Sequence, residues 1–324
     1  LYMKKRVMFV LNPKSGKGLI KSKLLDIIDL MVKGGMVITI FTTQYKMHGC
    51  ELIKKRGVRY DYIVISGGDG TLSECIKGLM SIEKEKRPVI GYIPSGSTND
   101  FAESLKLPKN MINAAKNILS GKKFNCDVGI FNDDYFIYIA AFGAFTDVSY
   151  DTPQDMKNIL GHTAYILEGI KRVGNLQKYH MLITHDNGSV EGDFIYGMVS
   201  NTTSVGGMKN LGKEKVQLDD GLFEVILVKY PQNPMDIQMI VTGILTQDFT
   251  SKVFCAFKTS KASFTSESGV QWTLDGEYGG THTNVDIENI SQAFSIMAPE
   301  KSSKTSDDKI QIIQDMYKGL MVRK

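Results

Sequence analysis

The sequence predicts an α/β domain followed by an antiparallel β domain, and two observations carry this prediction. From Arg6 to about Cys126, apolar runs of strand length alternate with amphipathic segments of helical period. Such alternation is typical of a parallel sheet with helices on both faces. After Asp127, short alternating apolar runs are separated by Asn, Asp, Gly and Ser, which indicates an antiparallel β-sandwich. We therefore expect two domains, residues 1–127 and residues 128–300.

The elements of the first domain follow from this alternation. Gly34-Gly35 is expected to end the first helix, because glycine is common just after a helix C-terminus. In parallel α/β sheets, ligands bind beyond the carboxyl ends of the strands, so the loops after the first, third and fourth strands are candidates for a site. Strands are expected at Val7–Leu11, Val37–Phe41, Tyr62–Ile65 and Val89–Ile93, and helices near Leu24–Met31, Thr71–Met80 and Met111–Ile118.

The second domain is expected to hold short strands and two helical inserts, Ala164–Val173 and Met235–Leu245. Residues 301–309 are polar and suit a linker, and an apolar stripe from Ile310 to Leu320 predicts a terminal helix. We expect residues 301–324 to pack back on the first domain, because basic membrane-surface helices carry a denser cationic face. The strands are expected at Phe136–Ala141, Met181–Thr184, Phe194–Val199, Phe223–Val228, Ser263–Thr265 and Ala293–Met297.

The composition limits the classes of protein. With 324 residues, 42% hydrophobic content and a net charge of +4, the chain is long enough for two cores and too weakly basic to suggest a nucleic-acid partner. Four well-separated cysteines indicate neither a disulfide framework nor a thiolate metal site, which fits a reducing cytoplasm. No apolar run has the form of a signal peptide or a membrane span. We expect a cytoplasmic protein that can associate peripherally with an anionic membrane.

The strongest chemical signal is the loop after the third strand, Ser66-Gly67-Gly68-Asp69-Gly70-Thr71. Its glycines can adopt backbone angles closed to other residues and bring N–H groups against an anion, beside the positive end of the helix that follows. Asp69 would repel a bare phosphate, so it points to a cation such as Mg²⁺ between carboxylate and phosphate. A glycine-rich turn with a solvated Asp is the alternative that this loop alone leaves open.

Two further loops carry polar groups at the same edge of the predicted sheet. Asn12-Pro13-Lys14-Ser15-Gly16 leaves the first strand, and its amide, hydroxyl and backbone groups suit a nucleotide, although a plain helix N-terminus would also account for it. Ser95-Gly96-Ser97-Thr98-Asn99-Asp100 leaves the fourth strand and carries more polar groups than a helix cap requires. We expect all three loops to face one crevice.

The three loops in this order resemble the catalytic domain of the diacylglycerol kinase and sphingosine kinase superfamily, and most closely its soluble bacterial lipid kinases. The resemblance covers nearly the whole chain. It implies a nucleotide-binding α/β domain like that of NAD kinases and phosphofructokinase relatives, which share the Gly-Gly-Asp-Gly-Thr loop. It also implies that ATP is contacted by Asn12, Pro13, Ser15, Gly16, Thr43, Gly67, Gly68, Asp69, Gly70, Thr71, Glu74 and Ser97.

The resemblance continues in the second domain. The segment from Trp272 to Glu277 matches the family's Asp-Gly-Glu motif, which implies that Asp275 is the general base for the acceptor hydroxyl. By itself, Asp-Gly is equally typical of a hairpin turn. The resemblance further implies a set of carboxylates that organise water and the catalytic Mg²⁺, namely Asp69, Asp100 and Asp127.

The segment from Val216 to Leu222 resembles the loop that holds a structural magnesium in bacterial members. The implied ligands are the Asp220 carboxylate and the carbonyl oxygens of Gln217 and Leu222, and a hard cation prefers oxygen ligands of this kind. From the residues alone, an Asp-Asp-Gly hairpin turn is the alternative. Two positions depart from the family pattern, since Ser97 stands where Thr is usual and Ser73 where Asn is common.

These features lead to one principal hypothesis. The chain is expected to be an ATP-dependent, Mg²⁺-requiring lipid kinase that phosphorylates the hydroxyl of a membrane lipid, with diacylglycerol as first choice and undecaprenol, phosphatidylglycerol and sphingoid bases left open. The alternatives are an NAD kinase-like enzyme and a nucleotide-binding regulatory protein without catalysis. The resemblance allows a homodimer. The five histidines lack metal-ligand spacing, and Trp272 is expected in the core.

Overall fold

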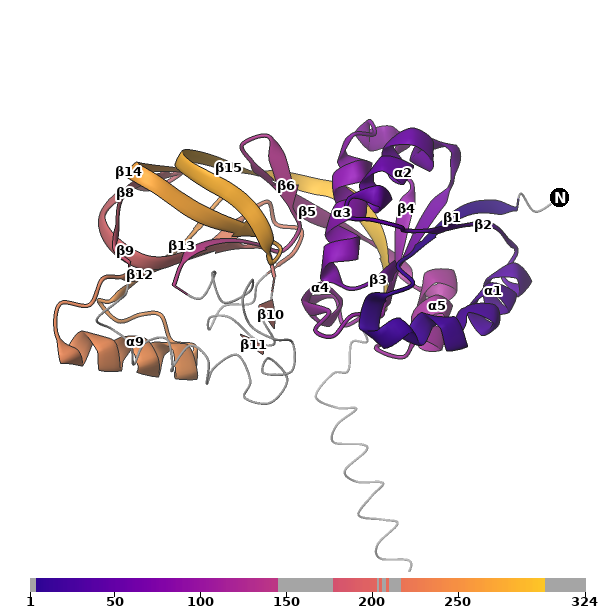
Figure 1. Cartoon of the computed structure of the whole chain (residues 1–324), viewed down its shortest axis with the longest axis horizontal. Helices are drawn as coiled ribbons and strands as arrows, with labels where there is room; N and C mark the ends of the chain where they lie inside the picture. Colours follow the sequence, from indigo (N-terminus) through magenta and orange to yellow (C-terminus); the bar gives the residue numbers. More distant parts are fainter. Residues whose placement is uncertain (1–3, 145–176, 203, 206–207, 210–216, 301–324) are drawn as a thin grey trace, which may run out of the picture.

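The computed structural model describes residues 4–144, 177–202, 204–205, 208–209 and 217–300. The chain is rich in strands, and Figure 1 shows two parts side by side, which we call the N-terminal part (residues 4–121) and the second part (the described residues from 122 to 300). The expected helix at Ala164–Val173, the expected linker and the expected terminal helix lie outside the described residues.

Four parallel strands form the centre of the N-terminal part, in the order β4-β3-β1-β2. The helices α1, α3 and α5 stand where the sequence predicts them, but the helix α2 was not expected. The residue before it, Met47, has a left-handed φ of 67° and makes no side-chain capping bond, so the start of the helix carries no sequence signal. The strands are β1 (Lys5–Leu11), β2 (Met36–Thr42), β3 (Tyr62–Gly67) and β4 (Val89–Pro94).

Helices cover both faces of these strands. On β1, Val7 and Phe9 are buried against α1 and α5, whereas Met8 and Val10 are buried against α2 and α3. Burial of alternate residues on opposite faces is typical of parallel strands in α/β proteins. The helices are α1 (Leu24–Lys33), α2 (His48–Arg56), α3 (Asp69–Met80), α4 (Asp100–Ser104) and α5 (Met111–Ser120), with short 3-10 helices at Ser15–Ser22, Gly57–Arg59 and Lys84–Lys86.

The strands of the second part pair antiparallel with one another. Their division into the two packed layers of a sandwich stays a prediction. The helix α9 (Pro234–Thr246) matches the expected insert at Met235–Leu245. The strands are β5 (Lys122–Phe131), β6 (Asp134–Phe136), β7 (Ile139–Gly143), β8 (Tyr179–His185), β9 (Gly188–Ser200), β10 (Ser204–Val205), β11 (Met208–Lys209), β12 (Phe223–Lys229), β13 (Phe254–Thr259), β14 (Lys261–Leu274) and β15 (Glu277–Ala298).

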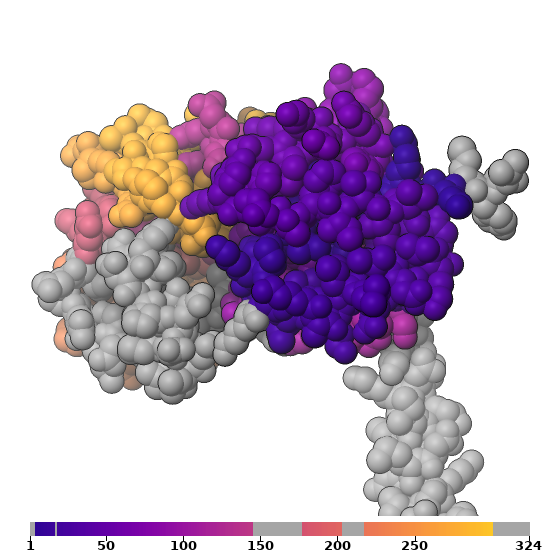
Figure 2. All heavy atoms as spheres, turned by 45° about the vertical axis from the view of Figure 1, so that its right-hand side comes forward, coloured from indigo at the N-terminus to yellow at the C-terminus, as the bar shows by residue number. Residues whose placement is uncertain are grey.

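One long strand connects the two parts. The 22-residue β15 pairs with β14 at its start, and near its end Ile296 pairs in parallel with Ile90 of β4. The sequence places a strand at Ala293–Met297 within the second domain, but in the structure this segment lies beside the parallel strands. Strand β5 also runs across residue 127, so hydrogen-bonded strands join the parts, and Figure 2 shows them in direct contact.

An aromatic cluster forms the core of the second part. Trp272 is completely buried, as the sequence predicts, and its ring packs against those of Phe131, Phe142 and Phe264 at centroid distances of 4.9 to 5.2 Å. Such edge-to-face and tilted arrangements favour aromatic packing. Because Trp272 lies on β14 three residues before Asp275, the cluster anchors the strand that leads to the candidate site.

Candidate active site

The structure brings the three predicted loops together at the carboxyl ends of β1, β3 and β4. Asn12 donates from its side-chain amide to the Thr71 hydroxyl over 3.1 Å, and its backbone N–H donates to the carbonyl of Ser66 at 2.9 Å. The first loop is thereby bound to the second. This is the edge at which parallel α/β sheets place their ligands.

Glycine is required where these loops touch. A Cβ atom at Gly16, whose φ is +53°, would lie 1.7 Å from the carbonyl oxygen of Ser95, and one at Gly96 would lie 2.5 Å from the Cα of Gly68. No side chain fits at such distances. The third loop is fastened by Asn99, whose amide accepts from Gly96 N–H at 2.9 Å and donates to Gly96 O at 2.8 Å. The glycines therefore make a close backbone-to-backbone contact rather than a loose turn.

Asp69 joins the glycine loop to the helix α4. Its carboxylate accepts from the backbone N–H of Asp100 at 3.0 Å and of Phe101 at 3.3 Å, at the N-terminal end of that helix. Burial raises the pKa of Asp69 to about 6, and the two backbone hydrogen bonds oppose this shift. Asp100 itself is 5% exposed. The structure thus places Asp69 and Asp100 together, as the sequence predicts.

The other residues predicted to contact the nucleotide lie in the three loops, on α3 and beside α2. Ser15 Oγ would lie 3.7 Å from a Cβ at Gly68. Thr43 Cγ2 and Glu74 Oε2 would lie 3.9 and 3.7 Å from a Cβ at Gly49, so both side chains reach the same backbone position. Pro13, Gly67 and Gly70 belong to the first two loops, and Ser97 is exposed at the third.

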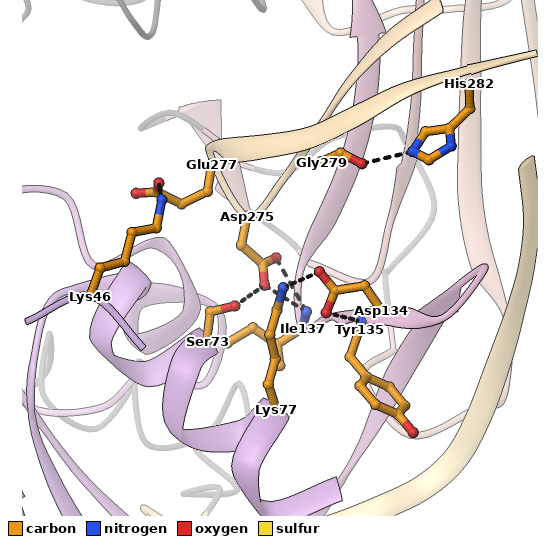
Figure 3. Close-up of polar contacts among 10 residues, drawn as sticks. All are labelled: Lys46, Ser73, Lys77, Asp134, Tyr135, Ile137, Asp275, Glu277, Gly279 and His282. Carbon is orange, nitrogen blue, oxygen red and sulfur yellow. Dashed lines mark hydrogen bonds and ion pairs between the residues drawn. The ribbon is translucent and has the colours of Figure 1, made fainter. Parts of the chain in front are cut away.

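The carboxylate of Asp275 lies where the second part meets α3 (Figure 3). It is 4% exposed and accepts from the Ser73 hydroxyl at 2.6 Å. It also accepts from three consecutive backbone N–H groups, of Ile137, Tyr138 and Ile139, at 2.9 to 3.2 Å. Burial raises the pKa of Asp275, and these donors oppose the shift. The side chain is therefore enclosed by donors.

The backbone of Asp275 is held as well. Its N–H donates to the carbonyl of Ile139 at 2.8 Å, and its carbonyl accepts from the Tyr138 hydroxyl at 3.0 Å. Asp275 has a φ of +52° and Gly276 a φ of +81°, so the chain reverses between β14 and β15 in a turn with two left-handed residues. An Asp-Gly pair suits such a turn. The hairpin and functional interpretations of this motif are thus both compatible with the geometry.

Glu277, which the sequence analysis does not select, lies near the glycine loop. It lies two residues after Asp275, its side chain is 56% exposed, and it forms an ion pair with Lys46 at 2.8 Å (Figure 3). Its Oε1 would lie 3.9 Å from a Cβ at Gly70, at the start of α3. The hydrogen bond to Glu277 raises the pKa of Lys46. The signal was available, because Glu277 is the third member of the Asp-Gly-Glu motif.

The structure groups Asp127 with the predicted magnesium loop. Its carboxylate accepts from the backbone N–H of Gly221 and of Gln292, both at 2.7 Å, and its own N–H donates to Leu218 O at 2.9 Å. Burial raises the pKa of Asp127. Asp127 therefore organises the segment that carries Asp220, and its bonds give no contact with Asp69 or Asp100.

The carboxylates of Asp220 and Glu224 lie close together, and the Lys258 ammonium lies beside both of them. The Asp220 carboxylate accepts from Leu222 N–H at 3.1 Å and lies 3.9 Å from the Lys258 ammonium. Nearby Glu224 is mostly buried, and its oxygens accept no hydrogen bond from the described residues, although Lys258 lies at 3.2 Å. Burial raises the pKa of Glu224 to about 7. Among the described residues no cluster of three metal-binding side chains occurs, but the predicted site needs one carboxylate and two carbonyl oxygens.

The four histidines within the described ranges make local contacts. His48 accepts from Gln44 N–H at 3.1 Å, and His282 lies 3.0 Å from the carbonyl oxygen of Gly279. His180 pairs with Asp193 at the surface. His185 stacks on Phe257 with a centroid distance of 4.0 Å. His162 lies outside the described residues.

Within the described ranges, every helix is too short or too polar to cross a membrane.

The chain is similar to known lipid kinases along most of its length. The family model described as the diacylglycerol kinase catalytic domain matches residues 6–131. Diacylglycerol kinase from Staphylococcus aureus (strain JH9) is 32% identical over 300 residues, which are 92% of this chain and 93% of the relative. A solved structure from Bacillus anthracis, provisionally named a diacylglycerol kinase, gives a TM-score of 0.79 at 27% identity and covers 92% of this chain and 97% of its own. A further B. anthracis structure, named a diacylglycerol kinase, gives 0.73 at 23% identity with 92% and 98% covered, which supports the fold.

The fold, the joined glycine-rich loops and these similarities define the class of protein, which is a lipid kinase. The resemblance that the three loops carry is thereby confirmed. Within that class, the chain belongs to the diacylglycerol kinase family.

Proposed function

We propose that this lipid kinase transfers the γ-phosphoryl group of ATP to the hydroxyl of a membrane lipid, with diacylglycerol as the first-choice acceptor. One observation carries the proposal: the N-terminal end of α3, which begins in the glycine loop, lies against the 275–277 turn of the second part. A phosphoryl donor held at the loop would meet an acceptor held at the turn. The name of the S. aureus relative supports the choice of diacylglycerol.

The proposed nucleotide site is the edge where the three loops meet. Backbone N–H groups of the glycine loop and the start of α3 would face the phosphates. Asn12 and Thr71, which are bound to each other, would fix the loop that faces the phosphate chain. The two-domain division predicted from the sequence assigns residues 1–127 to the nucleotide and residues 128–300 to the lipid, and this assignment stays a prediction. Ser15, Thr43, Glu74 and Ser97 would complete the ATP contacts.

Magnesium is proposed in two roles. Near the glycine loop, Asp69 and Asp100 would hold the divalent ion that accompanies ATP, and when bound it would neutralise charge on the phosphates. In the second part, the Asp220 carboxylate and the carbonyl oxygens of Gln217 and Leu222 would hold a structural ion. Adding MgCl₂ should raise the melting temperature of the wild-type protein but not of Asp220→Ala. An equal rise in both proteins would place stabilising magnesium elsewhere.

Geometry favours Glu277 over Asp275 as the proton acceptor. A general base must approach the proton it removes, and the Asp275 carboxylate is enclosed by four donors. Glu277 is exposed beside Gly70. In the proposed step, Glu277 takes the hydroxyl proton as the lipid oxygen bonds to the γ-phosphorus, and the bond to the β-phosphate oxygen breaks with its electron pair leaving on ADP. Asp275 would then shape the turn.

A lipid acceptor requires contact with a bilayer, so we propose peripheral association with anionic membranes from the cytoplasmic side. The mild net charge of +4 supports such contact. A homodimer is proposed on the family resemblance alone, and measurement of the solution mass tests it.

The decisive experiment is a lipid panel with labelled ATP and Mg²⁺. Vesicles containing diacylglycerol, undecaprenol, phosphatidylglycerol or a sphingoid base are each offered to the wild-type protein, and NAD is offered in parallel. We expect labelled phosphatidate as the main product. ATP binding without turnover on the whole panel would favour a regulatory nucleotide-binding protein, and labelled NADP would favour an NAD kinase.

A further inference from the structure

Ser73 connects the glycine-loop helix to the 275–277 turn across 202 residues of sequence. It lies in the second turn of α3, is 5% exposed, and donates its hydroxyl to Asp275 Oδ2 at 2.6 Å. This distance is in the usual range for a hydroxyl that donates to a carboxylate, a charge-assisted bond that is stronger than one between neutral groups. Both ends are shielded from water, so solvent competes little for the bond.

The other donors to Asp275 come from the second part. The N–H groups of residues 137–139 belong to the segment between β6 and β7 and to the first residue of β7, and they move with the turn if the two parts shift. Among the described residues, Ser73 is the donor to this carboxylate that belongs to the N-terminal part. The register of the turn against α3 therefore depends on the Ser73 bond.

The turn and the glycine loop share α3 as a common frame. Gly70 lies near the start of α3 and Ser73 follows three residues later, one helical turn along. Asp275 binds Ser73, and Glu277 Oε1 would lie 3.9 Å from a Cβ at Gly70. The Ser73 bond and this proximity place the turn along α3, with Glu277 toward the N-terminal end of that helix, where the phosphates would bind.

We propose that Ser73 is a positioning residue for phosphoryl transfer: its hydroxyl fixes the 275–277 turn on α3, so that Glu277 faces the acceptor at the glycine loop. This inference rests on the proposed function. It also gives a physical meaning to the departure at this position, because the Asn that is common in the family has an amide N–H that can donate in the same direction.

Lys77 provides a matched control for this proposal. It lies one turn after Ser73 on the same face of α3, and its ammonium pairs with Asp134 Oδ2 of β6 at 2.6 Å (Figure 3). Its side chain is 18% exposed. Lys77 therefore also binds α3 to the second part, but its partner does not belong to the turn. If the Ser73 bond only holds the parts together, loss of either bond should have the same effect.

The test compares Ser73→Ala, Ser73→Asn and Lys77→Met in the full chain. We expect Ser73→Ala to lower kcat by about 10- to 100-fold, because a misplacement of about 1 Å can cost this much. The KM for ATP should stay within about twofold, since the glycine loop is untouched. Ser73→Asn should recover most of the lost kcat, and Lys77→Met should keep kcat within about threefold. Equal losses for Ser73→Ala and Lys77→Met, or wild-type kcat in Ser73→Ala, would overturn the proposal.

A second readout does not depend on activity. Hydrogen–deuterium exchange of peptides that cover residues 274–280 should rise in Ser73→Ala and stay at the wild-type level in Lys77→Met. Unchanged exchange in Ser73→Ala would overturn the positioning role. If the wild-type protein phosphorylates no lipid while exchange responds as expected, the proposed function fails and the Ser73 link to the turn stands.

Discussion

The glycine-loop edge and the 275–277 turn face each other, but they are built in different ways. The edge consists of residues that lie directly after strands, and it combines close backbone contacts, as where Gly16 meets Ser95, with short side-chain bonds such as that from Asn12 to Thr71. The turn is assembled from α3, the β6–β7 segment and the β14–β15 hairpin, mostly through one buried carboxylate, Asp275. Substitutions at the edge should therefore alter nucleotide binding, whereas substitutions at the turn should alter chemistry or stability.

The largest effect is expected from Glu277→Gln, which tests the chemical half of this comparison. Loss of the proposed base should lower kcat by about 10² to 10⁴. The melting temperature should hardly change, because the side chain is half exposed and its ion pair is at the surface. Initial rates with saturating ATP and diacylglycerol vesicles measure kcat. Glu267→Gln, at an exposed position on β14, is the control. A fully active Glu277→Gln would return the role of base to Asp275.

Asp275→Ala tests the structural half. Removal of the carboxylate leaves the backbone N–H groups of residues 137–139 buried without their acceptor, at about 1 to 3 kcal/mol for each unsatisfied group. We expect the free energy of unfolding to fall by at least about 3 kcal/mol, as measured by urea denaturation. Asp275→Asn keeps one acceptor oxygen and should lose less. A loss below about 1 kcal/mol in Asp275→Ala would show that the carboxylate does not hold the turn.

Gly16→Ala tests the glycine-loop edge. The new Cβ would lie 1.7 Å from Ser95 O, so the first and third loops must separate, and we expect the affinity for ATP to fall at least about tenfold. Calorimetric titration with ATP measures it. Gly35→Ala is a matched control, because Gly35 also has a positive φ, +83°, but open space around its Cβ position. If Gly35→Ala lowers the affinity for ATP as much as Gly16→Ala does, the loss comes from strain at a left-handed residue and not from the contact between the loops.

The difference between the two regions also decides what the sequence could predict. The three loops are read directly, because each follows an apolar strand and parallel strands end at one edge. The contact of Ser73 with Asp275 could not be predicted, because it joins residues 202 positions apart and depends on the course of β15. Helix α2 was missed because its start lacks a capping side chain.

The Asp-Gly-Glu motif shows where sequence reasoning selects the right segment and leaves the residue open. The resemblance directs attention to Asp275, and burial is the property that separates it from Glu277. Asp275 is 4% exposed as a whole residue, whereas the side chain of Glu277 is 56% exposed. The exposure of these two side chains depends on the three segments that enclose the turn, and no local sequence pattern predicts it. The contacts of Asp127 could not be predicted from local sequence either, because its backbone partners at Gly221 and Gln292 are distant in sequence.

The smallest effect is expected from Lys46→Ala, which removes the exposed ion pair between the 275–277 turn and the loop after β2. Lys46 and Glu277 are 69% and 56% exposed, so water and salt screen the pair and it should contribute less than about 1 kcal/mol to folding. Urea denaturation at low and high NaCl measures this, and the difference from wild type should shrink as salt rises. Lys33→Ala, which breaks a comparably exposed pair with Asp29 inside α1, is the control. A loss above about 2 kcal/mol that persists in high salt would mean that Lys46, and not only the buried Ser73 bond, sets the distance between the turn and the glycine loop.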